Sequence, residues 1–253
     1  MPKNWAKGLT KDTDERVARA AWAHLGLKYK RRQIKRNNFA WSFELAYVVG
    51  LITTDGNLSK DGRHLEFTSK DKELVETFKS ILHLNNKISK KGSGSTTGKK
   101  YSRIQFGNVQ FYNWLVKIGL SPNKSRILGE LLIPDEYFFD FLRGYLDGDG
   151  HLRSFPDKLW PNSLRVYIEF TSASSQNLFW IQNTLKRLLN IKGSIRKQAS
   201  IFRLSFAKND SLLLLSRMYY DSEMPHLKRK KQKADEILNE NQAEVMKLEN
   251  MQP

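Results

Sequence analysis

An internal repeat constrains the fold of this chain more than any other feature. Three segments recur in the same order at offsets between 94 and 103: Gly50–Leu58 as Gly144–Leu152, Glu66–Ser69 as Glu169–Ser172, and Tyr101–Phe106 as Ile201–Phe206. Small changes of offset are what loop insertions produce. The chain is therefore predicted to be a tandem of two related halves.

Each half is predicted to contain the same elements in the order αββαββα. Both begin with a short apolar helix that is hydrophobic nearly all round and is expected to be buried, the first capped by Ser42. Alternating segments predict strands, and amphipathic segments predict the remaining helices. The expected helices are 41–54, 70–82, 109–119, 137–148, 175–189 and 210–220, and the expected strands lie around 57–59, 63–68, 87–91, 101–106, 151–154, 164–171, 194–198 and 201–206.

The repeat divides the chain into five parts. Pro122 and Pro134 break helices and mark the join between the halves. The resulting boundaries are a basic N-terminal extension 1–40, a first half 41–120, a linker 121–134, a second half 135–225 and a basic C-terminal tail 226–253. The extension is predicted to form a short helix and a basic arm, which would serve either as a DNA-grasping element or as a structural prop. The tail is expected to form one helix packed on the second half.

The charge balance indicates a polyanionic partner. Lys and Arg number 43 against 26 Asp and Glu, a formal net charge of +17. This excess favours nucleic acid. No run approaches the roughly 18 apolar residues of a spanning helix, so neither a membrane partner nor secretion is expected. Because the chain contains no cysteine, any metal must be held mainly by oxygen ligands, which suits Mg²⁺.

Two carboxylates occupy equivalent positions in the repeat. Asp55 and Asp149 each stand just past an apolar helix and before a strand. Asp-Gly pairs are also common in turns, but duplication of the motif favours a ligand role. If the two helices pack through Gly50 and Gly144, their carboxylates meet, and adjacent anions require a cation. Metals held by carboxylates beside a basic groove suit phosphodiester hydrolysis.

The segments "YVVGLITTDG" and "FLRGYLDGDG" resemble the two signature helices of monomeric LAGLIDADG homing endonucleases, with similarity over residues 41 to 233. The resemblance implies an α+β fold. It is a pseudo-twofold tandem of two αββαββα domains, whose antiparallel sheets form a DNA-binding saddle and whose signature helices meet at the interface.

The resemblance also implies a set of site residues. Asp55 and Asp149 would be the catalytic metal ligands, helped by the backbone oxygens of Thr54 and Gly148. Lys124 and Lys230 would lie near the scissile phosphates, with Lys228 as a rival to Lys230. Mg²⁺ is the expected cofactor, with Mn²⁺ or Ca²⁺ as substitutes for binding.

One position departs from the family's pattern. The earlier acid of the motif is Asp147 in the second copy, whereas Thr53 stands there in the first. Asp147 is interpreted as a helix cap and polar interface residue rather than a metal ligand, so Thr53 leaves metal binding intact.

DNA reading is assigned to the strands, because alternate side chains of an antiparallel sheet face one surface and a two-stranded ribbon fits the major groove. Phe67, Ile104, Phe170, Leu204 and Phe206 are expected on the core face. For each residue on the opposite face, the alternative to a base contact is an ordinary polar position exposed to solvent. The candidates are His64, Glu66, Thr68, Lys99, Tyr101, Arg103, Gln105, Arg165, Tyr167, Glu169, Thr171, Arg196, Gln198, Ser200 and Arg203.

Together with these patterns, the resemblance implies an intron-encoded, monomeric endonuclease that makes a double-strand break in a long, specific DNA site by divalent-metal-dependent phosphodiester hydrolysis. The alternative is a non-cutting binder on the same scaffold, either an intron RNA maturase or a transcription regulator. Double-stranded DNA is the expected partner, with intron RNA as the alternative. We expect an intracellular location at the host DNA, in a bacterial or archaeal cytoplasm or in an organelle.

Overall fold

The computed structural model describes Thr10, Thr13 and residues 39–92, 100–160 and 163–251. The chain divides into two units, Met1–Asn38 and Phe39–Pro253. In the first unit, Thr13 Oγ1 accepts a hydrogen bond from the Thr10 N–H at 2.9 Å. The predicted helix and basic arm of the N-terminal extension lie outside the described residues and stay predictions.

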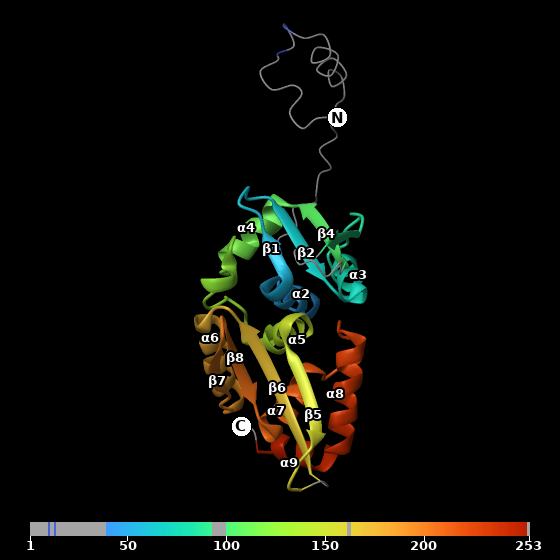
Figure 1. The fold of residues 1–253 in the computed structure, drawn as a ribbon, viewed down its shortest axis with the longest axis vertical. Helices are drawn as coiled ribbons and strands as arrows, with labels where there is room; N and C mark the ends of the chain where they lie inside the picture. The colour runs from blue at the N-terminus through green and yellow to red at the C-terminus, as the bar shows by residue number, and fades with distance from the viewer. Residues whose placement is uncertain (1–9, 11–12, 14–38, 93–99, 161–162, 252–253) are drawn as a thin grey trace. The chain divides into compact units, whose positions relative to one another are not determined.

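The second unit has the predicted tandem αββαββα order (Figure 1). The first half contains α2 (Phe43–Asp55), β1 (Gly56–Leu58), β2 (His64–Ser69), α3 (Lys72–Ile81), β3 (Ser89–Gly92), β4 (Lys100–Gly107) and α4 (Val109–Lys117). The second half contains α5 (Phe138–Asp149), β5 (His151–Pro156), β6 (Leu164–Ser172), α6 (Ser175–Leu189), β7 (Ser194–Gln198), β8 (Ile201–Phe206) and α7 (Lys208–Met218).

Each half contains one four-stranded antiparallel sheet. The strand orders are β1-β2-β4-β3 and β5-β6-β8-β7, so the two sheets have the same topology. Side chains alternate between a buried and a more exposed face, and the five predicted core residues Phe67, Ile104, Phe170, Leu204 and Phe206 are all buried. Helices α2, α3 and α4 contact the first sheet, and α5, α6 and α7 contact the second. The predicted fold class is therefore confirmed.

Helices α2 and α5 lie side by side between the sheets (Figure 1). Ser42 begins α2 as predicted, because its side chain accepts a hydrogen bond from the Leu45 N–H at 3.1 Å. The helices meet through Gly50 and Gly144. A Cβ at Gly50 would stand 2.2 Å from the Phe141 carbonyl oxygen, and one at Gly144 would stand 2.1 Å from the Tyr47 carbonyl oxygen. This glycine contact leaves no room for side chains between the two backbones.

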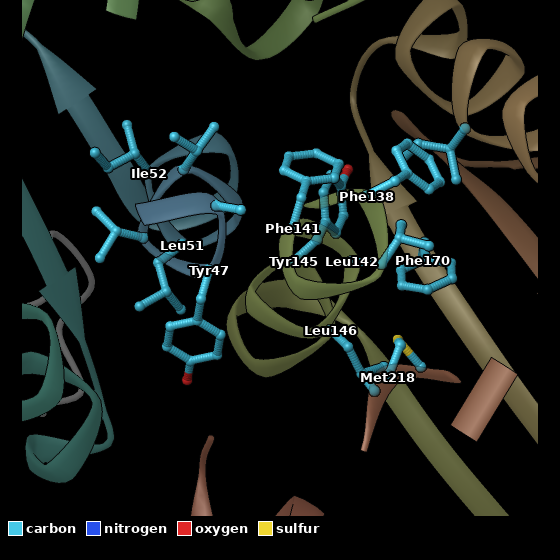
Figure 2. Packing of buried hydrophobic residues seen from close by; sticks show 14 of the residues in the cluster. Tyr47, Leu51, Ile52, Phe138, Phe141, Leu142, Tyr145, Leu146, Phe170 and Met218 are labelled. Atoms are coloured by element: carbon cyan, nitrogen blue, oxygen red, sulfur yellow. The ribbon is translucent and has the colours of Figure 1, made fainter. Parts of the chain in front are cut away.

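The large apolar side chains of both helices point away from the glycine contact. In Figure 2, Leu51 and Ile52 of α2 point away from α5, while Leu142 and Leu146 point away from α2. All four are at most 1% exposed. Each helix therefore packs these large side chains into the core of its own half and packs its glycine against the other helix.

The segments outside the repeat differ in part from expectation. The linker contains one short 3₁₀ helix, η1 (Lys124–Arg126), and another, η2 (Asp135–Tyr137), begins the second half. The expectation of one C-terminal helix is wrong, since the tail forms α8 (Lys228–Glu240) and α9 (Gln242–Glu249). The break lies at Asn241, whose carbonyl accepts the N–H groups of Glu244 and Val245 at 3.0 Å and so starts a new helix. As predicted, the tail packs on the second half, through α7 and β5.

Among the described residues, no helix combines the length and the hydropathy needed to cross a membrane.

Gly50→Ala or Gly144→Ala is expected to lower the free energy of unfolding by about 3 kcal/mol or more, because overpacking costs about 1–3 kcal/mol even where side chains can adjust. Here the new methyl group meets backbone atoms, so the helices must separate. Gly129→Ala is the matched control, since a Cβ there meets no atom within 4 Å. Chemical denaturation measures the differences, and equal stability of the Gly50 and Gly129 variants would contradict the close contact.

Candidate active site

Asp55 and Asp149 are the last residues of α2 and α5. They were expected just past the helix ends, but both still belong to the helices. The next residues, Gly56 and Gly150, cap the helices with extended backbone and donate their N–H groups to Ile52 O and Leu146 O. A Cβ on either glycine would stand 2.6 Å from the Cα of the residue four positions earlier. The glycine of each Asp-Gly pair is thus required by close packing, and the acids stand at equivalent helix ends.

Both carboxylates line one cleft with a volume of about 320 Å³. Its other lining residues include Tyr101 of the first sheet and His151 of the second, together with Lys230. A neighbouring cavity of about 520 Å³ is lined by Asp55, Thr54 and Lys124. Asp55 therefore borders both spaces, and the acids expected from the repeat line these spaces together with the lysines expected from the resemblance.

The surroundings raise the pKa of both acids. For Asp55, loss of hydration comes first and the charge of Asp149 second, and they raise the pKa to about 7 against the opposing effect of Lys124. For Asp149, loss of hydration again raises the pKa, opposed mainly by Lys230. The Asp149 side chain remains partly open to solvent. Two close carboxylates with raised pKa values favour binding of a proton or a cation.

Lys124 is the first residue of η1 and is only 6% exposed. Its Nζ donates a hydrogen bond to the carbonyl oxygen of Gly56, the residue after Asp55. Burial lowers its pKa to about 8, an effect that the charges of Asp55 and Asp149 oppose. The ammonium group is therefore fixed beside the first acid.

Lys230 has the equivalent position beside the second acid. It lies in the first turn of α8, is 7% exposed, and donates from Nζ to Gly150 O at 2.9 Å, to Asp147 O at 3.2 Å and to Leu146 O. Burial lowers its pKa to about 8, with the charge of Asp147 opposing. Its rival Lys228 is exposed. Gly56 and Gly150 correspond in the repeat, so in each half the glycine carbonyl after the acid accepts a hydrogen bond from a buried lysine that follows that half.

Asp147 is not a cap of its own helix. It lies inside α5 at 1% exposure, where its Oδ2 accepts hydrogen bonds from the Tyr47 hydroxyl of α2 and the Leu227 N–H, both at 2.8 Å. The expected cap role is wrong because α5 continues for two more residues, whereas the expected interface role is confirmed. Burial raises the pKa of Asp147 to about 6.

The donor set fits a hard divalent cation. Two carboxylates share the cleft, and Thr54 and Gly148 precede them on helices that touch there, since a Cβ on Gly148 would stand 2.0 Å from Thr54 Oγ1. In the part of the chain that the structure describes, no cluster of three or more His, Cys, Asp or Glu side chains suits a metal. The carboxylates of Asp55 and Asp149 are thus the candidate oxygen donors that this cleft brings together.

Most of the predicted DNA-reading residues lie on the sheet face opposite the core. Lys99 lies outside the described residues. Ser200 is not on a strand, because β7 and β8 join through a tight turn in which Ala199 has a φ of 52°. The residues that share the expected face are His64, Glu66, Thr68, Tyr101, Arg103, Gln105, Arg165, Tyr167, Glu169, Thr171, Arg196, Gln198 and Arg203.

Glu66 and Glu169 already have partners within their own sheets. Glu66 accepts hydrogen bonds from Lys91 Nζ at 2.5 Å and from Gln105 Nε2 at 2.8 Å. Glu169 accepts from Arg153 Nη2 at 2.6 Å and lies 3.3 Å from Arg203 Nη1. Sequence reasoning missed Lys91 and Arg153, although Arg153 alternates with His151 on a predicted strand.

Known proteins resemble this chain in family pattern and in sequence. The family model described as a LAGLIDADG-like domain matches residues 42–114 and 136–219. An A-type ATP synthase protein of Methanopyrus kandleri is 25% identical over 123 residues, which are 49% of this chain and 12% of that protein. The chain thus spans only a small part of this curated relative.

Two solved structures have a similar fold. The homing endonuclease I-WcaI bound to its DNA recognition sequence has a TM-score of 0.54 and 16% identity, covering 80% of this chain and 94% of that one. Full-length DUF199/WhiA from Thermatoga maritima has a TM-score of 0.51 and 18% identity, covering 81% of this chain and 63% of that one.

The family match covers more than half of the chain and includes both helices that carry the acids. The chain belongs to the LAGLIDADG-like domain family, with matching segments in both of its halves.

Proposed function

We propose that this protein is a site-specific endonuclease that makes a double-strand break in DNA by divalent-metal-dependent hydrolysis. The observation that carries the proposal is the duplicated acid and lysine pair. Asp55 and Asp149 share a cleft, and Lys124 and Lys230 each bind the glycine carbonyl that follows one acid. Two equivalent reaction centres suit the two strands of a duplex.

The two sheet faces would hold the DNA. They carry arginine and amide side chains suited to base edges, such as Arg103, Gln105, Arg196 and Gln198. The net charge of +17 favours phosphate binding. The DNA-bound I-WcaI structure, which has the same fold, also supports a duplex partner. A monomeric state and an intracellular location at the host DNA are parts of this proposal.

Asp55 and Asp149 would hold Mg²⁺ with the backbone oxygens of Thr54 and Gly148. Such an ion, when bound, offsets developing negative charge and makes water a better nucleophile at neutral pH. The proposed role of the two lysines does not depend on this ion. Their ammonium groups are held by backbone carbonyls, so they would offset charge on the scissile phosphates without first being ordered.

A non-cutting binder, either a transcription regulator or an intron RNA maturase, is the second candidate. The fold similarity to DUF199/WhiA, a protein that is not described as a nuclease, supports this second candidate. Filter binding against intron RNA and duplex DNA, together with a Mg²⁺ cleavage selection on a randomised duplex library, distinguishes the candidates.

Asp55→Asn and Asp149→Asn are each expected to reduce cleavage of at least one strand by about a hundredfold or more, because removal of a carboxylate ligand disables the charge-stabilising site. DNA affinity should stay within about threefold of wild type, since phosphate contacts dominate binding. Gel assays on the selected site measure both. Glu76→Gln, at an exposed acid of α3 in the first half, is the control. Retained double-strand cleavage in either site variant would refute the assignment.

The raised pKa of Asp55 predicts a pH-dependent stability. Because the folded state keeps this proton up to about pH 7 while the unfolded state loses it near pH 4, the free energy of unfolding should fall as pH rises through that range. Asp55→Asn should therefore stabilise the metal-free protein at pH 8, by on the order of 1 kcal/mol. Mg²⁺ at pH 8 should raise the Tm of wild type and not of the variant. Thermal melts between pH 5 and 8 test this, and an equal Mg²⁺ response in both proteins would count against the metal site.

If Arg196 contacts a phosphate, Arg196→Ala should weaken binding to specific and unrelated duplexes alike and reduce the slope of log affinity against log salt by about one. If Arg196 instead contacts a base edge, the substitution should relax the sequence preference at one base pair. Lys186→Ala is the matched control, because Lys186 is exposed on α6, among the helices that cover the other face of the sheet. Salt titrations of binding measure the slope. Equal effects of the two substitutions would contradict the assignment of this sheet face to DNA.

A further inference from the structure

The start of α8 concentrates positive charge where a helix least favours it. Leu227 is the N-cap, and the first four helical residues are Lys228, Arg229, Lys230 and Lys231. The N-terminus of a helix carries a partial positive charge, so cations there are unfavourable, at roughly 0.3–1 kcal/mol for each site. Carboxylates from other elements must therefore hold this turn in place.

Among the described residues, three carboxylates of other elements contact this turn, and they come from both halves. Asp147 Oδ2 of α5 accepts the Leu227 N–H at 2.8 Å. Asp71 Oδ2 accepts from Arg229 Nη2 at 2.9 Å, and Glu73 Oε1 accepts the Lys228 N–H at 3.3 Å. The Asp71 and Glu73 contacts are exposed to solvent and contribute little. Asp147 is the buried anchor, and a charged hydrogen bond shielded from water is the strongest of the three.

Asp147 also contacts the ammonium group of Lys230, the lysine that extends from this turn. Its own carbonyl oxygen accepts from Lys230 Nζ at 3.2 Å, beside the bond from Lys230 to Gly150 O. The Asp147 carboxylate therefore holds the backbone next to Lys230, and carbonyl oxygens of α5 accept hydrogen bonds from the Lys230 ammonium group. The Tyr47 hydroxyl orients the same carboxylate from α2.

In the described part of the first half, there is no counterpart of this anchor. Thr53 stands at the equivalent position, and its hydroxyl donates to Val49 O of its own helix at 2.7 Å. Lys124 is held by a different segment, whose Leu128 N–H returns to Lys124 O at 2.8 Å and whose Leu128 O accepts from Ser174 Oγ. The two lysines thus reach equivalent glycine carbonyls through unrelated supports.

We propose that Asp147 is a positioning residue for Lys230, and that it controls the second reaction centre without affecting the first. Its carboxylate fixes the first turn of α8 against α2 and α5, which sets the Lys230 ammonium beside Asp149. This inference rests on the proposed nuclease function only for its effect on cleavage. The positioning itself can be measured without DNA.

Competitive amine acylation of the full-length protein, read by mass spectrometry, tests the positioning. Asp147→Asn keeps the size of the side chain and removes its charge, so Lys230 labelling should rise by about threefold or more as the turn opens, while Lys124 labelling should stay within about 1.5-fold. Thr53→Val at the equivalent position is the control and should change neither. Unchanged Lys230 labelling, or an equal rise at both lysines, would overturn the proposal.

Strand-resolved cleavage tests the consequence. On a duplex labelled on each strand, Asp147→Asn should slow one strand by about tenfold or more and leave the other within about twofold, so that nicked product accumulates. General destabilisation would slow both strands together, and that result would overturn the selective role. If the wild-type protein binds DNA but cuts neither strand, the proposed function fails, and the acylation result alone decides the positioning role.

Asp147→Ser is used with the same two assays if the Asn variant lacks the native near-ultraviolet circular dichroism spectrum. It offers a hydroxyl where the first half has that of Thr53. The same selective rise in Lys230 labelling is expected, and its absence in a folded Ser variant would overturn the proposal.

Discussion

The direct contact between the backbones of α2 and α5 is the constraint on which the rest of the structure depends. Because Gly50 and Gly144 have no side chains, each helix approaches the carbonyl groups of the other. This contact fixes the crossing point and, since both helices end a few residues later, brings Asp55 and Asp149 to one cleft. It also joins the buried hydrophobic residues of the two halves into one cluster, in which Leu51 and Ile52 point away from α5 and Leu142 and Leu146 point away from α2 (Figure 2). One close approach thus sets both the assembly of the halves and the position of the acids.

The cleft gathers ionisable groups under conditions that oppose their charges. Burial raises the pKa values of Asp55 and Asp149 and lowers those of Lys124 and Lys230. The opposite charges offset part of this cost, and bonds to backbone carbonyls hold the two ammonium groups. A folded protein gains little stability from such a cluster, because the desolvation of buried ions can exceed their attraction. Groups that are kept together despite this cost are typical of a functional site.

Much of this arrangement could be predicted from the sequence, because it follows from local patterns. Alternation on the strands identified buried Phe67 and Phe170, and the repeated Gly and Asp positions predicted the meeting of the helix ends. Contacts between distant segments could not be predicted. Asp147 was interpreted as a cap because its partner Leu227 lies 80 residues away, and Glu66 was read as a base contact because nothing local indicates Lys91 as its partner. The helix break at Asn241 depends on a single buried residue in an otherwise helical pattern.

Neither repeat contains all the residues of the candidate active site. Lys124 comes from the segment that follows the first half, and Lys230 from the segment that follows the second, so each copy is completed by chain outside the repeat. These segments are under no constraint to resemble each other, and they fold as a 3₁₀ turn and a long helix. Pseudo-symmetry thus holds for the helices, the sheets, the acids and the glycines after them, and for the positions of the two ammonium groups, but not for the segments that supply the lysines. Under the proposed function, one sheet for each half of a DNA site and a separate support for each lysine would let such a chain recognise a target without twofold symmetry and adjust the two strand cleavages independently.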